Sequence, residues 1–94
     1  MNQPQRSKDN SSNFRAGLGR RIRCARVALG KTQEKLAADL GIARQTLITY
    51  ENGHTEMPSS ILKRLCDDFA LDAAWLLLGD ASRPMFARDE AKVA

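Results

Sequence analysis

The chain has 94 residues, of which 28% are charged, and this length allows one domain whose core can fold without disulfides or a structural metal. No apolar run approaches the roughly 20 residues of a membrane span, and the polar N-terminal stretch does not resemble a signal peptide. We therefore expect a cytoplasmic protein with no membrane association. Cys24 and Cys66 suit that compartment as reduced thiols, packed as small residues in or beside helices.

The net charge of +4 is unevenly distributed along the chain. Up to Arg44 there are ten Lys/Arg residues against three Asp/Glu, a balance of +7, whereas the remainder has five against eight, a balance of −3. A basic half suggests a polyanionic partner such as nucleic acid, and an acidic half suggests a solvated or protein-facing surface.

The first elements along the chain are a polar arm and an amphipathic helix. Residues 1–13 contain no apolar residue after Met1, so they are expected to form a flexible arm. From Phe14 the pattern becomes helical, and Gly30 is placed to end the helix. Its apolar stripe, spaced four, three and four residues, consists of Leu18, Ile22, Ala25 and Leu29.

Two short helices follow, separated by a glycine. Thr32 can cap a helix over residues 33–40, and Gly41 stands where a sharp turn requires positive φ. A third helix is predicted from about Arg44 to Glu51, and it ends at Asn52 and Gly53, which both tolerate the left-handed conformation.

The remaining sequence predicts two more helices and a tail. Pro58 suits the first turn of a fourth helix, and Asp72 can cap a fifth that ends at Gly79. Residues 81–94 are expected to be a tail, in which residues 85–93 could form a short helix. No segment alternates with a period of two, so we predict an all-α fold of five short helices, with the domain spanning residues 14–80.

The third predicted helix has two distinct faces. At 3.6 residues per turn, Leu47 and Tyr50 share a face that suits a hydrophobic core. Arg44, Gln45 and Ile48 lie on another face, where an exposed Ile48 needs an apolar contact. An alternative interpretation is that Arg44 and Gln45 are only solvated residues at the start of a helix.

A small basic all-α domain with two short helices joined at a glycine describes a helix-turn-helix. The segments "RIRCARVALGKTQEKLAADLGIARQTLITYENGHTEMP" and "LDAAWLLLG" closely resemble Cro/CI-type (Xre-like) helix-turn-helix repressors of phages and bacteria. The resemblance covers residues 20–79. It rests on "TQEKLA", Gly41, "ENG" and a late Trp-Leu-Leu, and it implies a lambda-repressor-like fold with residues 44–51 in the DNA major groove.

The resemblance implies roles at matching positions. Residues that reach base edges would be Ala43, Arg44, Gln45, Ile48 and Thr49. Residues that hold phosphates would be Thr32, Gln33, Asn52 and Gly53. Thr32 and Gln33 lie at a helix N-terminus, which presents unpaired N–H groups, whereas Asn52 and the N–H groups around Gly53 match a second backbone-contacting loop of the family. Arg26 and Glu51 would form a buried ion pair, although Arg26 could instead, or also, contact phosphate. Ala43 departs from the family by replacing a capping Ser or Thr, and Glu56 stands where a cation is common.

These observations predict a sequence-specific double-stranded DNA-binding transcriptional regulator. We expect a repressor or autoregulator that binds a near-palindromic operator as a homodimer. The alternative is a coactivator-like bridging module of the same fold that binds protein. The interface of the dimer is expected to include Leu77, Leu78, Met85 and Phe86, although Met85 and Phe86 could instead fold onto their own core.

Enzyme chemistry finds little support in the sequence. His54 is the only histidine, and no cysteine or carboxylate is spaced to form a metal site with it. We expect no catalytic activity, no cofactor, no metal and no small-molecule effector. The sequence does not distinguish a phage repressor from a restriction–modification controller or an antitoxin-like autoregulator.

Overall fold

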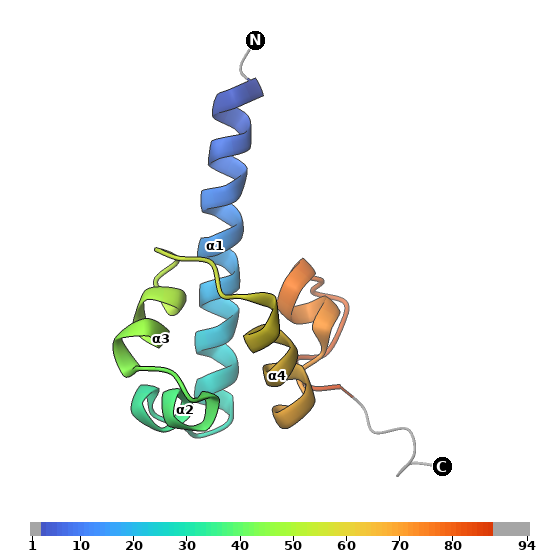
Figure 1. Ribbon diagram of the computed structural model, residues 1–94. Helices are drawn as coiled ribbons and strands as arrows, with labels where there is room; N and C mark the ends of the chain where they lie inside the picture. The colour runs from blue at the N-terminus through green and yellow to red at the C-terminus, as the bar shows by residue number, and fades with distance from the viewer. Residues whose placement is uncertain (1–2, 88–94) are drawn as a thin grey trace. The chain divides into compact units, whose positions relative to one another are not determined.

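The computed structural model describes residues 3–87, with side chains described from Ser11 onward, and it confirms an all-α fold. The elements are α1 (Gln3–Ala28), α2 (Gln33–Leu40), α3 (Arg44–Glu51), α4 (Ser59–Phe69) and η1 (Ala74–Leu78), a short π-helix (Figure 1). The chain divides into two compact units, residues 1–57 and 58–94. Unit 1 holds α1, α2 and α3, and unit 2 holds α4 and η1.

The helices α2 and α3 begin and end at the residues that the sequence predicts. The Lys35 N–H donates to Thr32 Oγ1 at 3.0 Å, which caps α2, and Gly41 ends α2 with φ of 70°. Because this conformation is left-handed, glycine adopts it without the steric cost that a side chain would add. Ala43 precedes α3 and makes no side-chain capping bond, because its methyl group has no hydrogen-bond acceptor.

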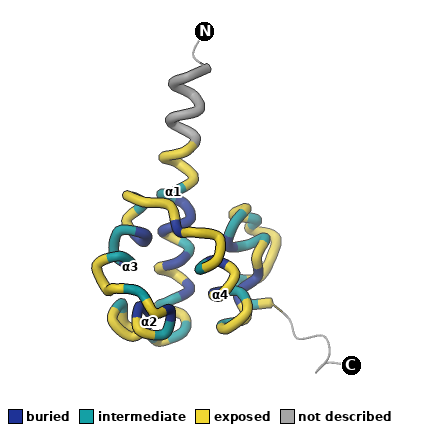
Figure 2. The backbone as a smooth tube through the Cα atoms, viewed as in Figure 1, coloured by how far each residue is buried: buried dark blue, intermediate teal, exposed yellow. Residues whose placement is uncertain are grey.

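In unit 1, α1 and α2 both pack against α3. The closest approach is at Gly19 of α1, where an added Cβ would lie 2.5 Å from the carbonyl oxygens of Tyr50 and Glu51. A glycine is therefore required for α1 to lie this close to the end of α3. The largest fully buried side chains of the unit are Leu18, Ile22, Leu36, Leu47 and Met57. Figure 2 shows buried stretches in each of α1, α2 and α3.

The N-terminal part of α1 differs from the predicted arm. The helix begins at Gln3, so residues 3–13 continue α1 where the sequence predicts an irregular segment, and Figure 1 shows these turns running past α3. Pro4 lies in the first turn, where a missing N–H costs no helical hydrogen bond, and no glycine interrupts the stretch. The prediction that this segment is flexible stays a prediction. Residues 1–2 lie outside the described part.

In unit 2, the chain after η1 returns to the turn that precedes it. The Asp72 N–H donates to the Met85 carbonyl at 2.9 Å, and Leu71 and Phe86 form an antiparallel bridge. Asp72 also accepts hydrogen bonds from Arg83 and from the Trp75 N–H, which together hold the pKa of its carboxyl below the usual range. The predicted helix over residues 85–93 is therefore wrong at residues 85–87, which are extended because they pair with residues 70–72. Residues 88–93 lie outside the described part.

Ala70, which ends α4, has a backbone conformation that alanine rarely adopts. Its φ is 59°, and it is the one non-glycine residue with positive φ among residues 3–87. A left-handed conformation costs a residue with a Cβ roughly 1–2 kcal/mol. A glycine at this position would avoid that cost, but it would lose more backbone entropy than alanine on folding, which offsets part of the gain. We expect Ala70→Gly to raise the melting temperature by a few degrees in a thermal melt followed by circular dichroism, whereas a lower value would contradict this.

Candidate nucleic-acid interface

Helix α3 separates its buried residues from its exposed ones. Leu47, Tyr50 and Glu51 are buried, whereas Arg44 and Gln45 are exposed. Among the other predicted base-contacting residues, Ala43 is exposed, and Ile48 and Thr49 are half-buried; the Thr49 hydroxyl donates to the Thr46 carbonyl at 2.7 Å. Five residues around the start of α3 therefore offer two long hydrogen-bonding side chains and several methyl groups to solvent.

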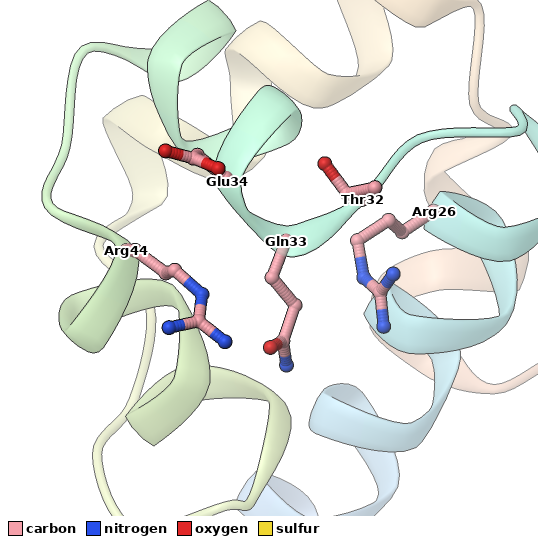
Figure 3. A pocket seen from close by; sticks show the side chains of 5 residues that line it. All are labelled: Arg26, Thr32, Gln33, Glu34 and Arg44. Atoms are coloured by element: carbon pink, nitrogen blue, oxygen red, sulfur yellow. The ribbon is translucent and has the colours of Figure 1, made fainter.

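A hollow of about 360 Å³ lies between the start of α3 and the start of α2. It is lined by Arg26, Thr32, Gln33, Glu34 and Arg44. Figure 3 shows the side chains of Arg44, Gln33 and Arg26 directed into the same space, whereas the carboxylate of Glu34 lies on the opposite side of the α2 start. The hollow thus presents two guanidinium groups and an amide, which is a suitable lining for an anionic group.

The carboxylate of Glu51 is at the centre of a buried polar network behind this hollow. Its side chain is 0% exposed, and Arg26 donates to it from Nε at 2.6 Å and from Nη2 at 3.2 Å. The Gln33 amide donates to Glu51 Oε1 at 3.1 Å, and Arg23 Nε lies 3.6 Å from the same oxygen. These contacts join α1, α2 and α3 at one point.

Gln33 and Arg26 therefore each have a structural contact in addition to their predicted roles. The Gln33 side chain, predicted to hold a phosphate, orients its amide nitrogen toward Glu51. Arg26 pairs with Glu51 and also donates from Nη1 to the Lys31 carbonyl at 3.0 Å, yet it still lines the hollow. The family resemblance predicts a phosphate contact for Gln33 and an ion pair with Glu51 for Arg26, but it does not indicate that both residues share one carboxylate.

The N–H groups of the loop after α3, which the family resemblance assigns to a phosphate contact, have acceptors within the chain. The N–H groups of Asn52, Gly53 and His54 donate to carbonyls of α3 at 3.0, 3.1 and 3.0 Å. They close the last turn of α3, so they are already used within the chain. The phosphate contact expected at Asn52 and Gly53 stays a prediction, and these bonds favour side chains over backbone N–H groups as its donors.

Two arginines of α1, which the sequence reasoning did not assign to the interface, contact this loop. Arg23 Nη2 donates to Asn52 Oδ1 at 2.9 Å, and Arg15 Nε donates to the Gly53 carbonyl at 3.3 Å. The spacing in the sequence indicates that the two arginines share a face of α1, because Arg15, Gly19 and Arg23 recur at intervals of four residues.

A comparison with protein families identifies the fold. Residues 19–82 match the family model described as a helix-turn-helix domain, a family of the Xre/Cro type. The chain belongs to the helix-turn-helix domain family. The match spans both units, and α2, Gly41 and α3 are its helix-turn-helix. The searches of curated proteins and of solved structures gave no match.

Membership of the helix-turn-helix family supports DNA binding and gives no sign of an enzyme. Within residues 3–87, no group of three or more His, Cys, Asp or Glu residues could hold a metal ion. In the same part of the chain, no helix combines the length and the apolar character needed to cross a membrane.

The four residues predicted to form the dimer interface lie in unit 2, and their side chains differ in solvent exposure. Leu78 is 79% exposed, the largest value among the exposed large hydrophobic residues that are described. Leu77 lines an apolar hollow of about 300 Å³ together with Leu62 and Cys66, and burial raises the pKa of the Cys66 thiol. Met85 and Phe86 are half-buried and pair with residues 70–72 of their own chain.

Proposed function

We propose that the protein is a sequence-specific, double-stranded DNA-binding transcriptional regulator, acting as a repressor or autoregulator. The observation that carries the proposal is the exposure of Arg44 and Gln45 at the start of α3, beside the hollow at the start of α2. In a helix-turn-helix, the start of the second helix is the part that enters the major groove.

The chemistry of these side chains suits base recognition. An arginine can donate two hydrogen bonds to guanine O6 and N7, and a glutamine can pair with adenine N7 and N6. Ala43, Ile48 and Thr49 offer methyl groups for the thymine methyl group. Thr32 and Gln33, at the α2 N-terminus, would hold a phosphate and so fix the register of α3 on the duplex.

The base-contact proposal predicts the effects of three substitutions. Arg44→Ala and Gln45→Ala should each weaken binding to the specific site by roughly 1–3 kcal/mol and have little effect on random DNA. Gln33→Ala should weaken both, because a phosphate contact carries no sequence information. Fluorescence anisotropy titrations with both DNAs measure these values. Equal losses on specific and random DNA for all three variants would exclude α3 as the reading helix.

We further propose that the regulator binds a near-palindromic operator as a homodimer. One helix reads only a few base pairs, whereas two helices related by a two-fold axis read half-sites roughly 34 Å apart. The exposed Leu78, next to Leu77 and its apolar hollow, supports an interface in unit 2. Because Met85 and Phe86 pair with their own chain, we propose that they support the residues of the interface from behind and do not form its centre.

The dimer proposal predicts the behaviour of a surface variant. Because Leu78 is exposed, Leu78→Asp should not disturb the fold, but it should place a charge in an apolar interface. Multi-angle light scattering should then show a dimer for the wild type and a monomer for the variant at the same concentration. A variant that remained fully dimeric would remove Leu78 from the interface.

A mobility-shift assay with DNA flanking its own gene tests the proposed function. The expected result is a shifted band that survives an excess of random competitor DNA. The alternative function is a protein-bridging module, which the acidic second half and the exposed Glu56 favour. Absence of any shift on flanking or random DNA would support that alternative.

A further inference from the structure

We propose that Arg15 and Arg23 of α1 form a second phosphate-binding site, which supplies the contact that the loop at Asn52 and Gly53 lacks. This inference rests on the proposed function, because the phosphates are those of the bound DNA. Both arginines lie on α1, outside the helix-turn-helix itself. Arg15 also precedes residue 19, where the family match begins.

The first argument is that the backbone N–H groups at the start of the loop are already bonded. The N–H groups of Asn52, Gly53 and His54 all donate to α3 carbonyls. Side chains are therefore the available donors for a phosphate beside Asn52 and Gly53. The cations that the structure places against the loop are Arg23, which donates to Asn52 Oδ1, and Arg15, which donates to the Gly53 carbonyl.

The second argument is that the single carboxylate near these arginines does not balance their combined charge. Arg23 is within ion-pair distance of Glu51, at 3.6 Å, but that carboxylate is already bonded by two nitrogens of Arg26 and by Gln33. The Arg23 side chain is 49% exposed. Among residues whose side chains are described, Arg15 contacts the Ser12 hydroxyl and a carbonyl, neither of which carries a charge. Each guanidinium has five N–H groups, so donors remain for an anion.

The third argument is the continuity of these groups with the first phosphate-binding region. Gln33 and Arg23 both approach the same oxygen, Glu51 Oε1, from the α2 start and from α1. From Arg23 the contacts lead to Asn52, which precedes Gly53, and from Gly53 to Arg15. A row of donors therefore runs from Gln33 to Arg15, and a DNA backbone following it would meet one cation beside Asn52 and another beside Gly53. The short distance between α1 and the loop makes this possible, since a Cβ on Gly53 would lie 2.9 Å from the Ala16 Cα.

The salt dependence of DNA binding tests the inference. Removing one cation that binds a phosphate should reduce the slope of log K against log salt concentration by about 0.9 for each protomer bound. We expect this reduction for R15Q and for R23Q, and about twice the reduction for the double variant. The probe is a random-sequence duplex, because binding to a phosphate does not depend on sequence. Lys63→Gln serves as the control, because it removes the same charge from the exposed Lys63 on α4.

The outcomes separate the inference from the proposed function. If R15Q and R23Q leave the slope at the wild-type value while Gln33→Ala weakens binding, the second phosphate site is refuted and the proposed function stands. If K63Q reduces the slope as much as R23Q, net charge explains the effect and the site is refuted. If the wild type binds no duplex, the proposed function itself fails. A lower melting temperature for R23Q with an unchanged slope would assign Arg23 a purely structural role and would also overturn the inference.

Discussion

Replacing Glu51 by alanine should remove a large share of the free energy of unfolding. The substitution leaves Arg26 without its counter-ion, and the Arg26 side chain is only 13% exposed. Removing one partner of a buried ion pair costs roughly 3–5 kcal/mol, whereas whole domains are stable by only about 5–15 kcal/mol. Gln33 also loses its acceptor. Urea unfolding followed by circular dichroism measures the loss of unfolding free energy.

Two control variants make the Glu51 result specific. Glu56→Ala removes the same side chain from an exposed position in the loop after α3, so it should leave the unfolding free energy almost unchanged. Replacing both members of the pair, Arg26→Met with Glu51→Leu, should cost less than Glu51→Ala alone, because no buried charge is left unpaired. Equal stability of the Glu51→Ala and Glu56→Ala variants would contradict a stabilising role of the ion pair.

The second large effect is expected at Gly19. A Cβ at this position would lie 2.5 Å from two backbone carbonyl oxygens of α3, and backbone atoms cannot move aside as a side-chain end can. We expect Gly19→Ala to lower the unfolding free energy by roughly 1–3 kcal/mol, although alanine favours the helix more than glycine.

Gly17 provides the matched control for Gly19. It lies in the same helix, but a Cβ there would have the flexible end of Arg21 as its nearest neighbour, at 3.1 Å. Gly17→Ala should therefore be neutral or stabilising by up to about 1 kcal/mol, the gain in helix propensity. Thermal melts of the two variants compare them directly. If Gly17→Ala proved as destabilising as Gly19→Ala, the close approach of α1 to α3 would not be the cause.

The sequence predicts the local features of this fold well because they depend on neighbouring residues. Thr32, Gly41 and the "ENG" segment act within one turn of a helix, so the bounds of α2 and α3 follow from them. The left-handed Ala70 could not be predicted, because the alanine side chain gives no sign of that conformation. The bridge between Leu71 and Phe86 depends on how the chain folds back after Gly79, which no local pattern shows.

The candidate site shows the same division. The exposure of Arg44 and Gln45 follows from helical periodicity and the family resemblance. The second contact of Gln33 with Glu51 and the contacts of Arg15 and Arg23 with the loop join residues 18 to 38 positions apart. Such contacts depend on the packing of α1 and α2 against α3, and a single sequence does not carry that information.

The most direct test of the central claim is a selection of binding sites from a pool of random double-stranded DNA. With the wild-type protein, the selected sequences should converge on a near-palindrome whose half-sites lie about one helical turn apart. The Arg44→Ala and Gln45→Ala variants should each lose the preference at particular positions of the half-site while keeping the others. Failure of the wild-type protein to enrich any sequence would contradict the claim that the exposed face of α3 reads DNA.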